Sequence, residues 1–363
     1  MKVIFGVCGI GNGHSQRQRS LITRFISDGH DVHVVCYGEA VPIFRKMTVG
    51  LTQVHVPWIT TDATGICFKA SARDKKNSNI LFFQENMLSL ASMEASFGCP
   101  DIVISDYEPT VAMLAYSRNI PLITIDQQSK YLGYHFSPID KSGQEAEASR
   151  LRLFFPQATL RIASSFFPLE EFPRTDIEVT VVPPILRDDI PNPTDFLSMP
   201  PPILLIYISP YGPTRQSLHE VVDAVLEVWN GHVVVYSQDC IEQEEGAVSL
   251  KIFNEKSFLF DLSRSMAVLC TAGHQLISEA VYLRKPILAW PFDNYEQYVN
   301  AHWIKKMGFG TWTKSLNKSI IADFQADLSK YRYNYQKTPR LYGKYTGVNA
   351  IIDKLKSMGL YGK

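Results

Sequence analysis

A histidine that ends a glycine-rich run near the N-terminus is the first side chain that could do acid–base chemistry. The run reads Gly9-Ile10-Gly11-Asn12-Gly13-His14 and follows Val3–Cys8, an apolar segment typical of a buried strand. Glycine allows positive φ and a close approach of the backbone to a ligand. Histidine, with an ordinary pKa of about 6.5, suits proton removal near neutral pH. We expect His14 to be a general base at the loop Gly11–Gly13; a capping or structural histidine is the alternative.

Such a base needs a carboxylate to orient its ring, and two aspartates are candidates. Asp106 follows the apolar run Ile102–Ser105, and Asp126 follows Leu122–Ile125. Both come directly after predicted strands, at the edge where open α/β sheets bind ligands. A carboxylate on the far imidazole nitrogen fixes the tautomer and stabilises the protonated ring. We expect Asp106 to be the partner of His14 and Asp126 to be the second choice.

A second polar cluster surrounds a predicted helix start in the C-terminal half. The predicted strand Ala267–Cys270 is followed by a turn at Gly273 and by a helix that starts near His274. Helix N-termini offer unpaired N–H groups and a positive potential, so Gly273, His274 and Gln275 form a candidate anion site. Glu279 follows within the same helix, where its carboxylate could accept hydrogen bonds from the hydroxyl groups of a ribose.

Other motifs are missing from the sequence. The glycine run lacks the third glycine of the G-x-G-x-x-G fingerprint, which argues against an NAD(P)-linked oxidoreductase, and no Gly-Lys-Ser/Thr P-loop follows it. None of the six cysteines stands two to four residues from another, which excludes a zinc knuckle. The pair Asp188-Asp189 lies in a proline-rich stretch, so we expect no metal site.

The secondary-structure elements that position these residues are predicted to form two successive α/β units. Short apolar runs alternate with amphipathic stretches of helical length, which is typical of parallel sheets covered by helices. A proline-rich segment interrupts the series. We expect a Rossmann-like domain over 1–185, completed by the C-terminal helix within 343–363. A linker over 186–202 and a second Rossmann-like domain over 203–342 complete the predicted organisation.

Composition narrows the classes of partner. The chain has 363 residues with 36 basic and 36 acidic side chains, and its net charge of zero argues against nucleic-acid binding by bulk electrostatics. It contains no apolar run of about 18 residues, so we expect a cytoplasmic protein. The tail 314–363 is rich in lysine, arginine and tyrosine. It is either a solvated face or a contact with an anionic acceptor or the inner face of a membrane.

The C-terminal cluster resembles the donor-binding signature of GT-B glycosyltransferases. It is similar to the MurG-type N-acetylglucosaminyltransferases and to the UDP-glucuronosyltransferase and plant secondary-product class. In that pattern a small-residue turn, a helix with glutamate, a Lys-Pro strand and a Gln-x-x-Asn-Ala segment follow in order. Here the matching residues are Thr271-Ala272-Gly273, Glu279-Ala280, Arg284-Lys285-Pro286, Pro291, Glu296-Gln297 and Asn300-Ala301. The Gly11–His14 segment likewise resembles the family's glycine-rich acceptor loop.

The resemblance implies a GT-B fold, in which two Rossmann-like domains face a cleft: 1–185 would be the acceptor-binding domain and 203–342 the nucleotide-sugar donor-binding domain. It also implies a role for each matching residue. Backbone N–H groups of Gly273, His274 and Gln275 would bind the diphosphate of a nucleotide sugar, and Glu279 would bind the ribose. The further implied contacts are Phe253 with a uracil-type base through its main chain, Glu296 and Gln297 with the transferred sugar, and the turn Ser209-Pro210-Tyr211-Gly212 with the phosphates.

Three departures from the family pattern stand out. Thr271 and His274 occupy positions where the plant-type signature has histidine and tryptophan. Arg17 stands where a proline often follows the family's histidine by three residues. We expect Arg17, like Arg19, to lie on a solvated helix face.

These observations together predict an inverting, metal-independent glycosyltransferase. It would move a sugar from a nucleoside-diphosphate sugar, a UDP-sugar in the first place, to a hydroxyl acceptor, with no cofactor besides this co-substrate. The acceptor stays open between a small molecule, a glycan and a lipid-linked sugar. Two alternatives share the donor site: a non-hydrolysing UDP-sugar 2-epimerase and a non-catalytic nucleotide-sugar-binding protein.

Overall fold

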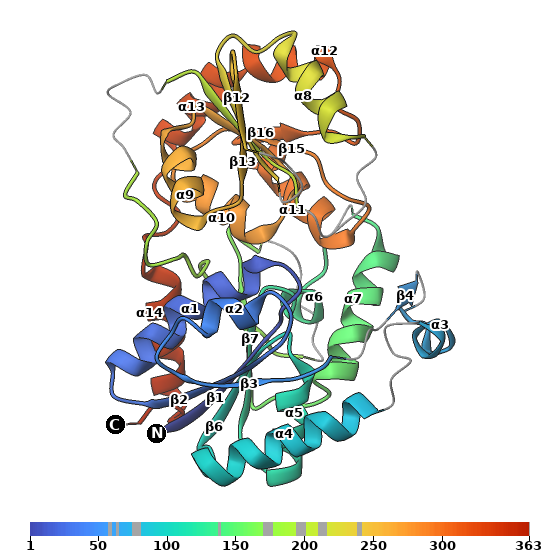
Figure 1. Cartoon of the computed structure of the whole chain (residues 1–363), viewed down its shortest axis with the longest axis vertical. Helices are drawn as coiled ribbons and strands as arrows, with labels where there is room; N and C mark the ends of the chain where they lie inside the picture. Colours follow the sequence, from blue (N-terminus) through green and yellow to red (C-terminus); the bar gives the residue numbers. More distant parts are fainter. Residues whose placement is uncertain are drawn as a thin grey trace. The chain divides into compact units, whose positions relative to one another are not determined.

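The chain divides into two compact units. The computed structural model describes residues 1–56, 60–62, 65–74, 81–136, 139–169, 177–193, 201–209, 216–237 and 242–362. One unit consists of Met1–Arg187 and Tyr345–Lys363, and the other of Asp188–Lys344 (Figure 1). The C-terminal residues thus join the N-terminal unit. The assignment of acceptor and donor to the two units stays a prediction.

A parallel sheet forms the centre of the first unit. Within the described residues its seven strands lie in the order β3-β2-β1-β6-β7-β8-β9, and every neighbouring pair is parallel. The strands are β1 (Lys2–Val7), β2 (Asp31–Cys36), β3 (Gly50–Gln53), β6 (Ile102–Asp106), β7 (Leu122–Asp126), β8 (Leu160–Ser164) and β9 (Thr180–Val182). A separate antiparallel pair consists of β4 (Thr61–Asp62) and β5 (Gly65–Ile66).

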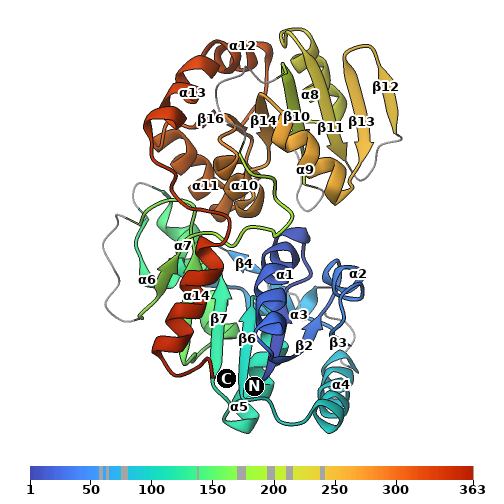
Figure 2. The same ribbon diagram turned by 90° about the vertical axis from the view of Figure 1, so that its left-hand side faces the viewer.

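Helices cover both faces of this sheet. The helices of this unit are α1 (Asn12–Ser27), α2 (Ala40–Phe44), α3 (Phe68–Arg73), α4 (Leu81–Phe97), α5 (Pro109–Arg118), α6 (Lys130–Gly133), α7 (Lys141–Phe154) and α14 (Thr346–Ser357), and α3 lies apart from the sheet, beside β4 (Figure 1). Because side chains of a strand alternate between its faces, Phe5 packs into a core with α1 and α14, whereas Ile4 packs into a core with α4, α5 and α7. Figure 2 shows α14 beside the strands of this unit.

The second unit has the same architecture, a mostly parallel sheet packed against helices. Its sheet has the order β12-β13-β11-β10-β14-β15-β16, and only β12 runs antiparallel to its neighbour. The strands are β10 (Ile203–Tyr207), β11 (His232–Ser237), β12 (Gln243–Glu245), β13 (Val248–Ile252), β14 (Ala267–Cys270), β15 (Ile287–Ala289) and β16 (Gly310–Trp312). The helices are α8 (Leu218–Leu226), α9 (Glu255–Arg264), α10 (His274–Tyr282), α11 (Tyr295–Lys306), α12 (Lys318–Ala326) and α13 (Leu328–Lys337). Side chains of α8, α12 and α13 share one core with β10 and β11.

Strand order places a switch point in each sheet. In the first unit the chain proceeds from β1 to β2 on one side and later to β6 on the other. In the second unit β10 is flanked in the same way by β11 and β14. Open α/β sheets bind ligands at the carboxyl ends of strands where the order reverses. The residues that follow β1, β6, β10 and β14 are therefore the ones to examine for function.

The α/β class predicted from the sequence is confirmed, with differences at the element ends. Helix α1 begins at Asn12 rather than at Ser15, so Asn12 and Gly13 belong to the helix and not to a loop. Of the predicted linker, the described residues 188–193 and 201–202 belong to the second unit, and 194–200 lie outside the described residues. In the described part of the chain, no helix is both long and apolar enough to span a membrane.

The turn after β1 depends on a close backbone approach at Gly9. A Cβ atom at this position would lie 1.6 Å from the carbonyl oxygen of Tyr37, whereas a Cβ at Gly273 would meet no atom within 4 Å. We expect Gly9→Ala to lower the free energy of unfolding by about 3 kcal/mol or more, because backbone cannot yield as a side chain does. Gly273→Ala, the control, has φ of −66° and room for the Cβ, so it should lower the free energy of unfolding only by the cost of alanine at a helix N-cap, about 1 kcal/mol. Urea unfolding followed by circular dichroism measures both, and equal stability of the two variants would contradict this view of the turn.

Candidate active site

The structure brings His14 and Asp106 together at the switch point of the first unit. Gly11 caps α1 with φ of 72°, a conformation that favours glycine, and this places His14 in the first turn of the helix. Asp106 ends β6 and lies beside Val7 in the register of the two parallel strands. The Nδ1 atom of His14 lies 2.8 Å from Oδ1 of Asp106. Asp106 is fully buried, and the His14 side chain is 14% exposed.

Asp126, the second-choice partner, has another role. Its carboxylate accepts hydrogen bonds from the backbone N–H of Ser129 at 2.6 Å and from the Ser129 hydroxyl at 2.8 Å. These bonds close the turn between β7 and α6. Burial raises the pKa of Asp126, an effect that the neighbouring charge of Asp106 reinforces. The geometry therefore makes Asp106 the group that orients His14.

Arg17 does not lie on a solvated face, and that prediction was wrong. Its Nε donates to Oδ2 of Asp106 at 2.6 Å, and its Nη2 donates to Oδ1 at 2.6 Å. The same Nη2 lies 2.7 Å from Nδ1 of His14. Gln18 adds a bond from its Nε2 to Oδ2 of Asp106 at 2.9 Å. Because α1 starts at Asn12, residues 14, 17 and 18 share one helix face, which turns toward the end of β6.

Charges around His14 set its proton affinity. Burial lowers the pKa of His14, but a Cys8 thiolate and the Asp106 carboxylate outweigh burial and the opposing charge of Arg17, and the pKa is raised to about 10. For Cys8, burial raises the pKa, but His14 and a hydrogen bond with Tyr37 more than offset it, and the pKa is lowered. Burial also opposes ionisation of Asp106, yet Arg17 and His14 hold its pKa down at about 2. Asp106 therefore stays a carboxylate while His14 gains or loses its proton.

In the second unit, the start of α10 holds the predicted anion site. Gly273 is the N-cap residue, and His274, buried, is the first residue of the helix. The first N–H groups of a helix have no partner within it, so they can bind an anion. Glu279 is buried further along the same helix, and its Oε1 accepts a hydrogen bond from Nε2 of Gln275 at 2.8 Å. This bond fixes the carboxylate relative to the helix start.

Two turns meet at the switch point of the second unit. The backbone N–H of Ser209, after β10, donates to Oγ1 of Thr271, after β14, at 3.4 Å. Thr271 thus uses its hydroxyl where the plant-type signature has a histidine. Tyr211 and Gly212 lie outside the described residues.

The start of α11 supports the turn before α10. Asn300, fully buried, donates from Nδ2 to the carbonyl oxygen of Ala272 at 2.9 Å and so fixes the backbone before Gly273. This bond was not foreseen, although the Gln-x-x-Asn-Ala spacing marks the residue. Gln297 accepts a hydrogen bond at Oε1 from the backbone N–H of Phe292 at 2.8 Å. Glu296 lies half-buried in the first turn of α11.

Phe253 lies where β13 ends and belongs to an aromatic cluster. Its ring centroid is 5.7 Å from that of Tyr207 and 5.3 Å from that of Phe258. Nearby, Asp261 accepts hydrogen bonds from the Tyr236 hydroxyl at 2.7 Å and from Nζ of Lys251 at 2.8 Å. Because the Phe253 side chain is engaged in packing, its contribution to a ligand would come from the main chain.

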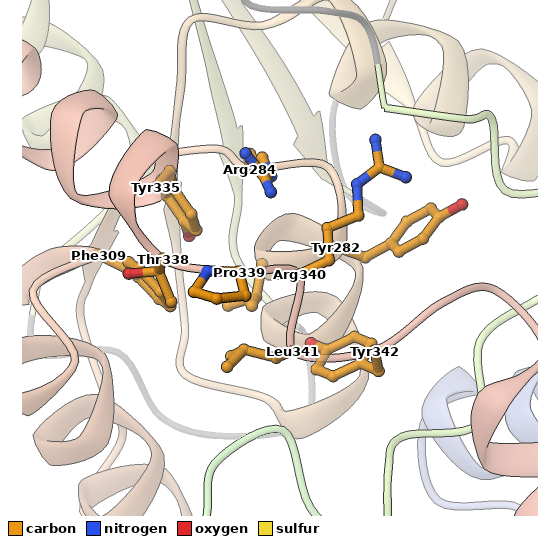
Figure 3. A pocket seen from close by; sticks show the side chains of 10 residues that line it. Tyr282, Arg284, Phe309, Tyr335, Thr338, Pro339, Arg340, Leu341 and Tyr342 are labelled. Carbon is orange, nitrogen blue, oxygen red and sulfur yellow. The ribbon is translucent and has the colours of Figure 1, made fainter.

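A small cavity lies at the other end of α10 (Figure 3). It is lined by Arg284, Phe309, Tyr335 and the segment 338–342, and its volume of about 20 Å³ is close to that of one water molecule. This cavity is too small for a nucleotide. The same segment anchors the helix, because the Tyr342 hydroxyl donates to the carbonyl oxygen of Ser278 at 2.9 Å. The cavity is thus a packing feature at the C-terminal end of α10.

The described residues contain no group of three or more His, Cys, Asp and Glu side chains placed to hold a metal ion.

Comparison with known proteins agrees with this geometry. The sequence profile of glycosyl transferase family 1 matches residues 1–329. An uncharacterized glycosyltransferase of Methanosarcina acetivorans is 22% identical over 97% of each chain. Among solved structures, Arabidopsis thaliana UGT89C1 complexed with UDP has a TM-score of 0.67 at 12% identity, covering 98% of this chain and 99% of that one. MurG of Acinetobacter baumannii has a TM-score of 0.60 at 12% identity, covering 99% and 100%.

Two Rossmann-like units, each with polar residues at its switch point, and a family match over most of the sequence lead to one conclusion. The chain is a GT-B enzyme that belongs to glycosyl transferase family 1.

Proposed function

We propose that this glycosyltransferase moves a sugar from a UDP-sugar to a hydroxyl acceptor with inversion at the anomeric carbon. The observation that carries the proposal is the 2.8 Å contact between Nδ1 of His14 and Oδ1 of Asp106. A buried carboxylate at Nδ1 keeps the proton on that nitrogen and leaves Nε2 free to accept one. The first unit would bind the acceptor, and the second would bind the donor.

The reaction would be a single displacement. Nε2 of His14 takes the proton of the acceptor hydroxyl while the acceptor oxygen forms a bond to the anomeric carbon. The bond between that carbon and the diphosphate oxygen breaks, and its electron pair leaves with the diphosphate. Asp106 stabilises the imidazolium that forms, because its pKa of about 2 keeps it charged throughout.

The leaving diphosphate would be stabilised by the main chain. The N–H groups at the start of α10 and the helix dipole supply positive potential where the negative charge develops, so the proposal needs no metal ion. Glu279 would bind the ribose, the main chain at Phe253 the base, and Glu296 and Gln297 the sugar. The related plant structure is described as a complex with UDP, which supports a uridine nucleotide as the donor here.

The donor site is tested by Glu279. We expect Glu279→Ala to weaken UDP binding by about 1–3 kcal/mol, since hydrogen bonds to a charged group are lost. Glu279→Gln keeps the size of this buried side chain and should weaken binding in the same direction. Glu244→Ala, on the exposed strand β12, is the control and should bind normally. Isothermal titration calorimetry measures all three, and unchanged affinity of both Glu279 variants would remove the residue from the donor site.

The base is tested by His14. We expect His14→Ala to lower turnover by about 10²–10⁴-fold while UDP affinity is kept, because general-base catalysis contributes about that much. His55→Ala, at an exposed histidine of the same unit, is the control. Products are analysed by mass spectrometry with UDP-sugars and acceptor pools. Formation of an epimer from the UDP-sugar without an acceptor would show that the enzyme is an epimerase and not a transferase. A nearly normal turnover of His14→Ala would show that His14 is not the base.

The pH dependence follows from the raised pKa of His14. Only the deprotonated ring can take a proton, so kcat/KM should rise with pH through a value above the ordinary 6.5 of histidine. The Cys8 thiolate favours the imidazolium, so Cys8→Ala should lower the pKa of His14 and move this rise to lower pH. The measurement is a pH profile of kcat/KM for both proteins. A rise at the same pH in both would show that Cys8 does not tune the base.

A further inference from the structure

We propose that Arg17 is a positioning residue that holds Asp106 in a two-point ion pair and places a fixed positive charge beside the His14 ring. The inference rests on the proposed function insofar as it treats His14 as the base. It concerns a residue that stands where the family often has a proline, so the family pattern does not supply it.

The geometry is that of a planar fork. Nε and Nη2 of Arg17 each lie 2.6 Å from a different oxygen of Asp106, and Gln18 donates to one of these oxygens as well. Arg17 is 3% exposed and Asp106 is fully buried, so the pair lies in a medium where charges interact strongly. A lysine could not make both bonds, because its ammonium group is a point donor without the fork.

Arg17 is close enough to influence which imidazole nitrogen carries the proton. Its Nη2 lies within hydrogen-bond distance of both Asp106 Oδ1 and His14 Nδ1. Because Nη2 carries two N–H groups, it can pair with Oδ1 and also face Nδ1. A neutral His14 that donates from Nδ1 to Oδ1 has Nε2 available as the base, whereas one that accepts from Arg17 carries its proton on Nε2. In either state the positive charge of Arg17 lies directly beside the ring.

Arg17 also limits how basic His14 becomes. The titratable and charged groups around the ring are Cys8 after β1, Arg17 on α1 and Asp106 at the end of β6, with Tyr107 at 6.2 Å between ring centroids. Cys8 and Asp106 raise the pKa of His14, and Arg17 lowers it. Without Arg17, two negative groups would favour the imidazolium, and less of the neutral base would be present at a given pH.

Stability alone does not account for this pair. Burying two charges costs much of what their attraction returns, and well-packed apolar residues often stabilise such a site equally well. Its place within 2.7 Å of the proposed base indicates a role in setting the protonation of His14.

The test is an NMR titration of the His14 imidazole nitrogens, assigned by comparison with His14→Gln. We expect Arg17→Gln to raise the pKa of His14 by about 1–3 units, the usual effect of one nearby charge. Arg17→Lys keeps the charge and should give a smaller shift. Arg24→Gln, on the exposed part of the same helix and paired with Asp28, is the matched control and should give none. In a pH profile of kcat/KM, Arg17→Gln should move the rise to higher pH, opposite to Cys8→Ala.

A second comparison covers the case in which Arg17→Gln does not fold. The double variant Arg17→Gln/Asp106→Asn removes both buried charges, and Asp106→Asn alone leaves Arg17 beside the ring. The pKa of His14 should be lower in Asp106→Asn than in the double variant. Equal pKa values in this pair, or an unshifted His14 in a folded Arg17→Gln, would overturn the inference. Because the titration needs no turnover, absence of sugar transfer would count against the proposed function alone.

Discussion

The site in the first unit depends on one buried carboxylate. Asp106 ends β6, and its side chain binds three residues of α1: His14, Arg17 and Gln18. A buried carboxylate must be ionised and fully hydrogen-bonded or else neutral, and here Arg17 and His14 keep it ionised, while Gln18 donates a further hydrogen bond. The interaction that fixes the helix on the sheet is therefore the same interaction that orients the His14 ring. Loss of the carboxylate would disturb both.

The second unit has groups of a different kind at the corresponding switch point of its sheet. There the switch point carries main-chain groups and the start of α10, with one carboxylate, Glu279, further along the helix. Asn300 fixes the turn before this helix, and Tyr342 fixes the helix from the other side. A developing negative charge is best met by dipoles that cannot move, because they need no reorganisation during reaction. The switch point of the first unit thus carries a titratable side chain, and that of the second unit carries main-chain groups at a helix start.

The sequence predicted the elements with strong periodicity and the residues at their ends. Buried runs such as Val3–Cys8 and Ile102–Ser105 identify their strands, and Asp106 was correctly placed next to His14 as the partner. Short strands such as β9 and β16 and the helix α7 were missed, because three to five residues carry little periodicity and α7 is rich in polar side chains. The role of Arg17 could not be read from the sequence. Its role depends on where α1 starts, because His14, Arg17 and Gln18 share one helix face only when the helix includes residue 14.

Arg17 stands where related sequences often have a proline, and this difference changes the charge beside His14. A proline in its place would have no guanidinium to pair with Asp106, and the carboxylate would then act on the imidazole almost alone. With Arg17 present, the pair contributes little net charge at the ring, while Cys8 still adds a negative group whenever its thiol ionises. The proton affinity of His14 is thereby set by a balance of three neighbours from three elements. Such a balance responds to a change in any one of them, so a single substitution at Cys8 or Arg17 would change the basicity of His14 while the His14–Asp106 contact is kept.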